Sequence, residues 1–435
     1  MDPPISILGP SSLDLKHTET LVSYLKQNHV FETLPQQEHR ACVLDKLNKL
    51  LKVWVKKGKG EIQLVPFGSY RLGVNTPTGD IDVLMCGTIP RGAIFESLGR
   101  ILQQHPAIKD CSIITAAFIP IIKFTIDGID IDLIYSHVPP SLFKINLTTW
   151  NLRDPSEKVL QFDPMKPNSC DLSQLDPTDL HSLNGFRATE WILNLVPNQE
   201  NFRIALRMIK FWAKQRDIYS NILGFFGGIS WSILVAKICQ LYPNAVSSTL
   251  LLKFFQFYSV WKARGPVTLN QIRLPRKSYD LVQILTPIEP CINSTHNASK
   301  TTWSIIEQEI ERGRKLLEEG FNWARLCKKK QFFTRYKLFL AVHIENHGDE
   351  KVFGLVESKL RHFLGAIEKE PLIAIPYPHR VQEYFFIAIK AEKGTKQLDL
   401  RPATKLLRSL FEDVSFTLKF KTYTQATLPI LPNTT

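Results

Sequence analysis

The stretch FGSYRLGVNTPTGDID, residues 67–82, decides the interpretation of this chain because it joins a Gly-Ser turn to an acidic β-strand. Side chains in a strand alternate between its two faces, so Asp80 and Asp82 point the same way with Ile81 packed behind them. Two carboxylates a few ångströms apart repel each other unless a cation lies between them. Hard divalent ions prefer such oxygen ligands. The stretch therefore predicts a strand that carries a metal-binding acidic pair.

A second acidic strand supplies a third carboxylate. In GIDIDL, residues 128–133, Asp130 and Asp132 also share one face. Three acidic side chains at strand ends are what a two-metal phosphoryl-transfer site requires, and Gly68-Ser69 offers backbone N–H groups and a hydroxyl to a phosphate. Each feature alone would be an ordinary turn or strand end. Their combination resembles the signature of the nucleotidyltransferase superfamily.

The segments around this site predict a small α/β sheet domain followed by a helical region. Helical periodicity covers residues 18–55, and a helix-like stretch covers residues 93–105. The β-rich segments are residues 62–67, 81–85, 119–126 and 129–135. A polar, proline-rich segment, 151–177, then leads into helices whose apolar stripes lie at 201–216, 228–241, 247–262 and 301–319.

The last hundred residues predict a third unit. The order is strand (337–344), helix (351–364), strand (372–375), strand (384–389), helix (403–411) and strand (414–420). This βαββαβ arrangement is used by RNA-recognition modules. It also recurs in unrelated roles, so the topology alone is weak evidence for RNA binding.

Composition bounds the class of protein. The 435 residues include 54 Lys and Arg against 41 Asp and Glu, a net charge of +13, and the pI is near 9.3. This excess favours a polyanionic partner, although it can also serve solubility alone.

The seven cysteines are scattered without a Cys-x-x-Cys pair, which makes a disulfide framework or structural zinc unexpected. No apolar run is long enough to cross a membrane, so we expect a soluble protein of a reducing compartment.

A basic stripe marks the helix at 201–216. Arg203, Arg207, Lys210 and Lys214 follow one another at helical spacing and share one face. The rest of this helix is apolar, so the stripe is expected to face an anionic ligand such as a triphosphate. A solvated face or salt bridges to neighbouring acids are the alternatives.

Several longer stretches resemble eukaryotic nuclear poly(A) polymerases of the vertebrate and fungal type. They are FGSYRLGV with GDID, LNGFR, FRIALRMIKFWAKQRDIYSNILGFFGGISW, AKICQLYPNA, STHNAS and FGLVESKLR, and they follow in order between about residues 5 and 365. The resemblance implies an α+β multidomain fold: a nucleotidyltransferase palm of mixed sheet and helices, a helical middle domain and an RRM-like C-terminal domain. The implied ranges are an N-terminal segment (1–17) packing on the middle domain, then 18–178, 179–334 and 335–435.

The resemblance also implies roles for individual residues. Asp80, Asp82 and Asp132 match the catalytic, metal-binding carboxylates. The residues expected to bind the nucleotide are Phe67, Gly68, Ser69, Thr76, Asn184, Lys210, Lys214, Tyr219, Asn221, Gly228 and Ile229. Among these, residues 67–69 match the phosphate loop, and Asn221, with Ser299, is a candidate polar partner for adenine.

The activity implied is template-independent addition of AMP from ATP to the 3′ end of RNA, with release of pyrophosphate and two Mg²⁺ or Mn²⁺ ions. The implied partners are the RNA 3′ end, ATP and proteins of the cleavage and polyadenylation complex, with no membrane and a monomeric catalytic unit. The implied location is the nucleus, although no import signal is evident. The alternatives are a uridylyl- or CCA-adding transferase and an inactive RNA-binding scaffold.

Overall fold

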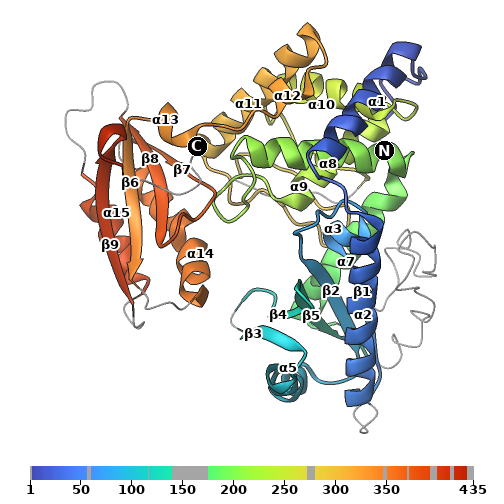
Figure 1. Ribbon diagram of the computed structural model, residues 1–435, viewed down its shortest axis with the longest axis vertical. Helices are drawn as coiled ribbons and strands as arrows, with labels where there is room; N and C mark the ends of the chain where they lie inside the picture. The colour runs from blue at the N-terminus through green and yellow to red at the C-terminus, as the bar shows by residue number, and fades with distance from the viewer. Residues whose placement is uncertain are drawn as a thin grey trace.

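The chain folds into two sheets separated by a helical part (Figure 1). The computed structural model describes residues 2–55, 60–115, 117–139, 175–271, 280–345, 350–369, 372–391, 399–411 and 416–428. Most of the proline-rich segment expected at 151–177, one cysteine (Cys170) and the expected start of the last strand at residue 414 lie outside these residues.

The first sheet has the order β1-β2-β5-β4-β3, in which β2 and β5 are parallel and the other pairs are antiparallel. Its strands are β1 (Ile62–Pro66), β2 (Ile81–Gly87), β3 (Ile108–Ile114), β4 (Ile121–Ile126) and β5 (Ile129–His137). Alternate apolar residues of β2, such as Ile81 and Val83, pack into a core with α2 (Leu34–Val55) and α5 (Gly99–Gln104). The polar residue between them, Asp82, therefore faces the opposite side of the sheet.

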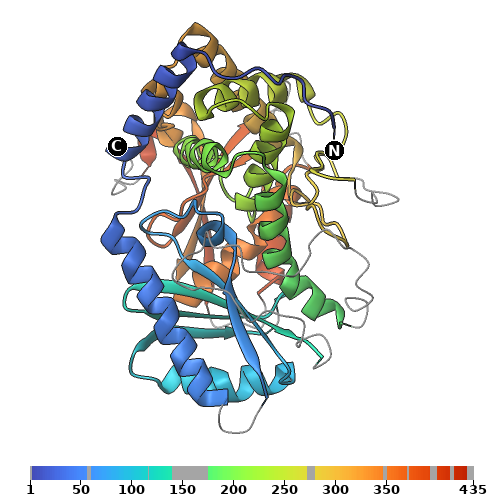
Figure 2. The ribbon, with the colours of Figure 1, turned by 90° about the vertical axis from the view of Figure 1, so that its right-hand side faces the viewer.

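That opposite side is covered in part by α7 (Pro177–Leu195), so α2 and α7 lie on the two sides of the sheet (Figure 2). Phe186 of α7 packs there against Leu84 and Ile134. Asp176 caps this helix by accepting a hydrogen bond from the Thr178 N–H, and Pro177 occupies its first turn. The acidic strands and α7 are thus fixed to one another by a shared apolar layer.

Strand β3 was not expected from the sequence. Its residues IKDCSII lack a clean alternation of apolar and polar side chains, and it is an edge strand. Asp110 has a left-handed backbone with φ of 51°, and the pairing with β4 shifts register between Lys109 and Ser112. An irregular edge strand of this kind gives no period-2 signal. The helix expected at 93–105 is present as α4 (Arg91–Ala93), a π-helical turn (Ile94–Leu98) and α5.

The helical part is built around one large apolar core. Its main helices are α1 (Ser12–Gln27), α7, α8 (Gln199–Gln215), α9 (Gly228–Leu241), α10 (Ser247–Trp261) and α11 (Lys300–Glu319), followed by the short α12 (Trp323–Leu326) and α13 (Phe332–Arg335). Leu21 and Leu25 of α1 are buried in this core, so the structure packs α1 with the helices rather than with the first sheet. No described helix is both long and apolar enough to span a membrane.

The N-terminal segment lies against the same helices. The Ile5 N–H donates to the Leu241 carbonyl at 2.8 Å, and the Asn244 side chain donates to the Ile7 carbonyl at 2.6 Å. Asp2 pairs with Lys237 at 2.5 Å. These contacts join the first residues of the chain to α9 and to the turn that follows it.

The C-terminal part has the predicted βαββαβ order. Its elements are β6 (Leu338–Glu345), α14 (Glu350–Ile367), β7 (Leu372–Pro376), β8 (Tyr384–Ala391), α15 (Arg401–Ser409) and β9 (Thr417–Thr424), with a short 3-10 turn (Gln425–Thr427) behind them. The sheet is antiparallel with the order β7-β8-β6-β9. Helices α14 and α15 cover one face through a core that includes Val342, Phe363 and Leu407.

The other face of this sheet packs in part on the helical part. Phe339 and Phe386 of the sheet lie against Phe332 and Phe333 of α13, with ring centroids 5.9 Å apart for Phe332–Phe339 and 5.2 Å apart for Phe333–Phe386. In RNA-recognition modules aromatic residues on this face stack on bases. Here a large share of the face is used to join two parts of the protein.

Two glycines in helices test how closely α10 and α11 pack, one at their contact and one at an open position. An added Cβ at Gly313 of α11 would lie 2.3 Å from the Phe255 ring of α10, whereas one at Gly365 of α14 meets nothing within 4 Å. We expect Gly365→Ala to stabilise the protein by up to about 1 kcal/mol through helix propensity. Gly313→Ala should destabilise it by about 1–3 kcal/mol through overpacking. Denaturant midpoints measure both, and stabilisation by both substitutions would contradict the close α10–α11 contact.

Candidate active site

A row of charged side chains crosses the first sheet on the face that carries α7. Asp82 of β2 and Asp132 of β5 are register partners on parallel strands, and Lys123 of β4 is the register partner of Asp132 on its other side. Carboxylate oxygens of Asp80, Asp82 and Asp132 all lie within 4.8 Å of one another. The structure therefore brings the acidic pair Asp80 and Asp82 together with Asp132, which the sequence placed on a second strand.

The crowding of these acids changes their proton affinity. Burial, followed by the charges of Asp80 and Asp132, raises the pKa of Asp82 to about 7. Burial also raises the pKa of Asp132, although the Lys123 ammonium, 2.5 Å from its Oδ2 atom, opposes that shift. Three carboxylates this close need positive charge nearby in order to stay ionised.

Two lysines and a tyrosine of the helical part stand within electrostatic reach of the acids. Burial lowers the pKa of Lys210 to about 8 and lowers that of Lys214, while the Asp80 charge opposes both shifts. Burial raises the pKa of Tyr219 to about 12, and the charges of Asp80 and Asp82 add to the shift. The Lys214 ammonium lies 5.4 Å from the centre of the Tyr219 ring. Cationic groups of α8 thus reach the acidic row from a different part of the fold.

The basic stripe of α8 divides into two functions. Arg203 Nε donates to the Leu72 carbonyl at 3.0 Å. Arg207 donates to the carbonyls of Gly73 and Asn75, at 2.8 Å each. An anionic ligand was one expectation for the stripe, but Arg203 and Arg207 donate instead to backbone carbonyls of the loop at 72–75.

Lys210 stands at the boundary between these two functions. Its Nζ donates to the Val74 carbonyl at 3.1 Å. Its positive charge also acts to lower the pKa of Asp82. An ammonium group has three donors. The contact with Val74 therefore leaves donors for a further acceptor.

The Gly-Ser turn packs directly against the acidic strand. Gly68 has φ of +63°, and an added Cβ would lie 2.2 Å from Asp82 Oδ2, so only glycine fits there. The Phe67 N–H donates to the Asp82 carbonyl at 3.0 Å, and the Gly68 N–H donates to Thr189 Oγ1 of α7 at 3.1 Å. The Gly68 N–H is thus used within the protein, and the contribution of this turn to a phosphate falls mainly to Ser69.

A buried arginine that the sequence did not reveal holds the second half of the loop. Arg40 of α2 is 1% exposed. Its Nη2 atom donates to the carbonyls of Thr76 at 3.1 Å, Pro77 at 3.2 Å and Gly79 at 2.7 Å, and its Nε pairs with Glu32. This network fixes Thr76 and the turn before Asp80. A lone arginine on a helix carries no spacing signal that could have identified the role.

The LNG segment on α7 presents a hydrogen-bond donor. Arg187 Nη1 donates to Asn184 Oδ1 at 2.9 Å and to the Glu289 carbonyl at 2.9 Å. Asn184 Nδ2 is buried and has no hydrogen-bond partner among the described residues. An added Cβ at Gly185 would lie 2.6 Å from the Phe67 ring, so α7 and the Gly-Ser turn are in close contact. Because Arg187 occupies the amide oxygen, a ligand of Asn184 must offer an acceptor.

The break between α8 and α9 presents a hydrogen-bond acceptor, whereas Asn184 presents a donor. Asn221 Oδ1 is buried without a hydrogen-bond partner among the described residues. Added Cβ atoms at Gly227 and Gly228 would lie 3.1 Å from Asn221 Cβ and 2.9 Å from the Tyr219 hydroxyl, so these glycines leave room for both side chains. Ile229 is half-buried and packs against the helical core. Asn221 therefore offers a buried acceptor.

Ser299 does not serve as expected. Its hydroxyl accepts from the Thr302 N–H as the N-cap of α11 at 3.3 Å, and it donates to Glu368 Oε1 at 3.2 Å. The sequence made this residue a candidate partner for adenine. Because the helix cap and Glu368 occupy the hydroxyl, its contacts are structural.

Comparison with known proteins places this site in a family. Three domain families match in order: the poly(A) polymerase nucleotidyltransferase domain at residues 1–156, the poly(A) polymerase central domain at 201–333 and the poly(A) polymerase predicted RNA binding domain at 331–405. The chain belongs to the poly(A) polymerase family. The three matches agree with the sheet, helical and second-sheet parts of the fold.

Individual relatives and solved structures agree with this family. The chain is 38% identical over 409 residues to a poly(A) polymerase of Dictyostelium discoideum, covering 86% of this chain and 49% of that protein. It is 32% identical over 449 residues to nuclear poly(A) polymerase 4 of Arabidopsis thaliana, covering 92% of this chain and 58% of that protein. This chain thus spans about half the length of these relatives.

Among solved structures, a Cid1 poly(U) polymerase bound to MgATP matches with a TM-score of 0.52 and 15% identity. The match covers 72% of this chain and 99% of the other. A further Cid1 structure, described as an RNA terminal uridylyl transferase, matches with a TM-score of 0.51 and 14% identity, covering 73% of this chain and 98% of the other. At this identity the likeness establishes the fold alone.

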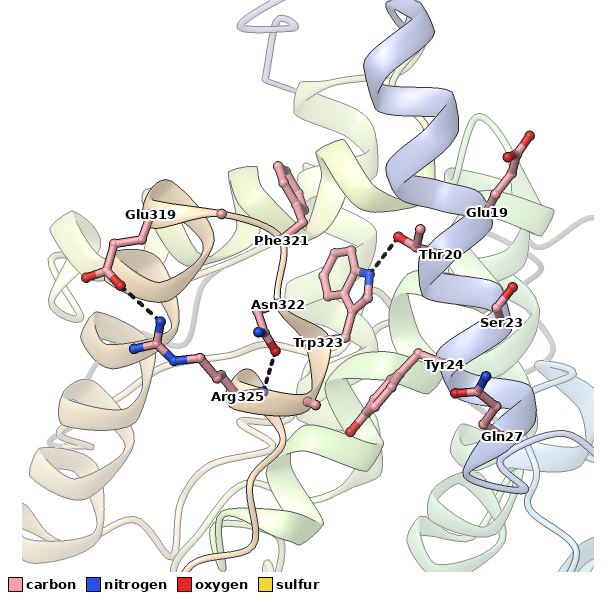
Figure 3. A pocket seen from close by; sticks show the side chains of 12 residues that line it. Glu19, Thr20, Ser23, Tyr24, Gln27, Glu319, Phe321, Asn322, Trp323 and Arg325 are labelled. Atoms are coloured by element: carbon pink, nitrogen blue, oxygen red, sulfur yellow. Dashed lines mark hydrogen bonds and ion pairs between the residues drawn. The ribbon is translucent and has the colours of Figure 1, made fainter.

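A separate groove of about 870 Å³ lies between α1 and the segment that joins α11 to α12 (Figure 3). Two pairs of its polar groups bond each other: Trp323 Nε1 donates to Thr20 Oγ1 at 3.1 Å, and Arg325 pairs with Glu319 at 3.5 Å. None of the three acids lines it. The groove is therefore not the site of phosphate chemistry.

The contact between Thr189 and Gly68 can be tested by an isosteric change. Thr189→Val keeps the volume of the side chain and removes the acceptor of a part-buried backbone N–H. We expect it to lower the free energy of unfolding by about 1–3 kcal/mol, while Thr189→Ser, which keeps the hydroxyl, should cost less. Denaturant midpoints and hydrogen exchange at the Gly68 amide measure both effects. Unchanged exchange in Thr189→Val would contradict the bond.

Proposed function

We propose that this protein is a template-independent RNA 3′-adenylyltransferase that makes poly(A) tails from ATP. The observation that carries the proposal is the cluster of Asp80, Asp82 and Asp132, within 4.8 Å of one another and faced by Lys210 and Lys214. Membership of the poly(A) polymerase family supports the same activity.

The acidic cluster fits divalent cations. All its donors are carboxylate oxygens, the ligands that hard cations prefer. The pKa of Asp82 is raised by burial and then by the charges of its acidic neighbours, and a bound cation would offset that repulsion. Asp80, Asp82 and Asp132 would hold the ions, Mg²⁺ or Mn²⁺. When bound, such ions supply acidification of the primer hydroxyl and stabilisation of negative charge on the leaving group.

In the reaction the 3′ oxygen of the RNA forms a bond to the α-phosphorus of ATP, and the bond from that phosphorus to the β-phosphate bridging oxygen breaks. The hydroxyl proton goes to solvent, and pyrophosphate leaves. Lys210 and Lys214 would bind the β- and γ-phosphates and offset their charge, with Ser69 donating from the Gly-Ser turn. The arginines and backbone bonds that hold residues 72–79 keep these groups in a fixed geometry.

The buried amides account for the choice of ATP. Adenine carries an amino donor at N6, which the Asn221 oxygen can accept, whereas guanine and uracil present carbonyl oxygens that would face that acceptor unpaired. The Asn184 amide, whose oxygen is held by Arg187, would donate to an oxygen of the ribose or phosphate. Stacking of the incoming base on the terminal RNA base would favour purines over cytosine.

The proposal extends to partners and location. A net charge of +13 suits an RNA substrate, and the C-terminal part matches a predicted RNA binding domain. Relatives named as nuclear poly(A) polymerases support a nuclear location, where proteins of the cleavage and polyadenylation complex would be its partners. For the catalytic unit we propose a monomer. For its divisions we propose the ranges 1–17, 18–178, 179–334 and 335–435, although α1 crosses the first boundary and packs on the helical part.

Incorporation of each labelled nucleoside triphosphate onto an oligo(A) primer tests the proposal. We expect ATP to be used in preference to GTP, UTP and CTP. Asp80→Asn or Asp132→Asn should lower AMP transfer by roughly a thousandfold or more, because each removes charge at the reacting centre. Asp130→Asn is the matched control, since Asp130 bonds Thr125 at 2.7 Å and lies outside the cluster.

Two results would contradict the proposal. Equal use of UTP or CTP by the unaltered protein would leave a nucleotidyltransferase of another specificity. A tenth or more of the parent activity in Asp80→Asn would exclude the acidic cluster as the catalytic centre.

The buried Lys210 predicts a pH dependence of ATP binding. Its pKa of about 8 means that the free protein carries a protonated Lys210 below that pH and loses the proton above it. A bound triphosphate favours the protonated form, so the affinity for ATP should fall up to tenfold per pH unit above about pH 8. Binding titrations with Lys210→Met should show weaker binding without this decline. The same decline in Lys210→Met would assign it to another group.

A further inference from the structure

Two segments that stand out in the sequence, STHNAS at 294–299 and FGLVESKLR at 353–361, belong to different parts of the fold and meet in space. Arg361 Nη1 of α14 donates to Asn297 Oδ1 at 2.6 Å. Beyond the end of α14, Glu368 accepts from Ser299 Oγ at 3.2 Å. The C-terminal part thus holds this short segment at two of its polar side chains, Asn297 and Ser299.

The same segment also contacts the break between α8 and α9, where Asn221 lies. Asn297 Nδ2 donates to the backbone carbonyl of Asn221 at 3.1 Å. The Asn297 carbonyl approaches Gly224 so closely that an added Cβ there would lie 2.8 Å away. Asn221 is the residue whose side-chain oxygen is buried without a hydrogen-bond partner among the described residues and is proposed above to accept from adenine. The hydrogen bonds therefore run without a gap from Arg361 through Asn297 to Asn221.

We infer that Arg361 is a positioning residue for nucleotide selection, through which the C-terminal part controls the orientation of Asn221. The inference rests on the proposed ATP specificity and adds to it a contribution from outside the pocket. Arg361 lies in none of the elements that hold the acids or the lysines.

The chemistry of the Asn297 amide explains why an arginine is needed. An amide side chain has one acceptor end and one donor end, and a rotation of its terminal bond exchanges them. Arginine has only donors, so its bond to Oδ1 fixes the amide with Nδ2 toward the Asn221 carbonyl. Without Arg361 only the bond to the Asn221 carbonyl orients the amide, so the amide rotates more freely and holds the backbone at Asn221 less firmly.

The test measures equilibrium binding of ATP and GTP to the full chain in the presence of Ca²⁺, by calorimetric titration. We expect Arg361→Ala to lower the preference for ATP over GTP by roughly threefold to tenfold, the size of coupling effects carried through bonded networks. Because Arg361 is exposed, the denaturant midpoint should change little. Arg361→Lys should restore part of the preference.

Two further variants separate the links. Asn297→Asp keeps an acceptor for Arg361 and loses the donor to Asn221, so it should lower the preference as Arg361→Ala does. The double variant should be no worse than either single one, because both break the same chain of bonds. Lys359→Ala removes the same charge from the same helix and should leave the preference unchanged.

Three outcomes would overturn the inference: an ATP preference in Arg361→Ala equal to that of the parent, an equal loss in Lys359→Ala, or a loss of RNA affinity alone, which would make Arg361 a direct RNA contact. If the unaltered protein shows no preference for ATP, the proposed function fails together with the inference. If the parent prefers ATP and Arg361→Ala does so equally, only the inference fails.

Discussion

The electrostatic repulsion among three neighbouring carboxylates is the constraint on which the rest of the structure depends. Parallel pairing of β2 and β5 sets Asp82 directly beside Asp132, and burial on the α7 side of the sheet strengthens their repulsion. Positive charge close to such a site favours the ionised form of its carboxylates. Lys123 supplies it from β4, and Lys210 and Lys214 supply it from α8.

Two helices, α8 of the helical part and α2 on the first sheet, bind the loop that leads into the acidic strand. Arg203 and Arg207 bond its carbonyls from α8, and Arg40 bonds the turn just before Asp80 from α2. A buried arginine is retained where backbone carbonyls satisfy its donors. The loop at 72–79 is thus held from two helices. These hydrogen bonds help to fix the distance between the acids and the lysines.

The C-terminal part uses an RNA-recognition topology for a different purpose over much of its sheet. Phe339 and Phe386 pack against α13, while α14 reaches the segment behind Asn221 through Arg361. Its position relative to the helical part is therefore coupled to the residues proposed to read the base. An RNA surface on this part must avoid the covered area of the sheet, which leaves its helices, its loops and the uncovered end of the sheet.

The sequence by itself determined the features that follow from local periodicity. Alternation along a strand put Asp80 and Asp82 on one face, helical spacing aligned the basic residues of α8, and the order of segments predicted βαββαβ. The edge strand β3 was not predicted because its residues show no such periodicity. Only the tertiary structure decided that Lys123 pairs with Asp132, that Arg203 and Arg207 bind carbonyls, and that Ser299 caps a helix. Those partners depend on strand register and helix contacts between residues far apart in the chain, which no local pattern encodes.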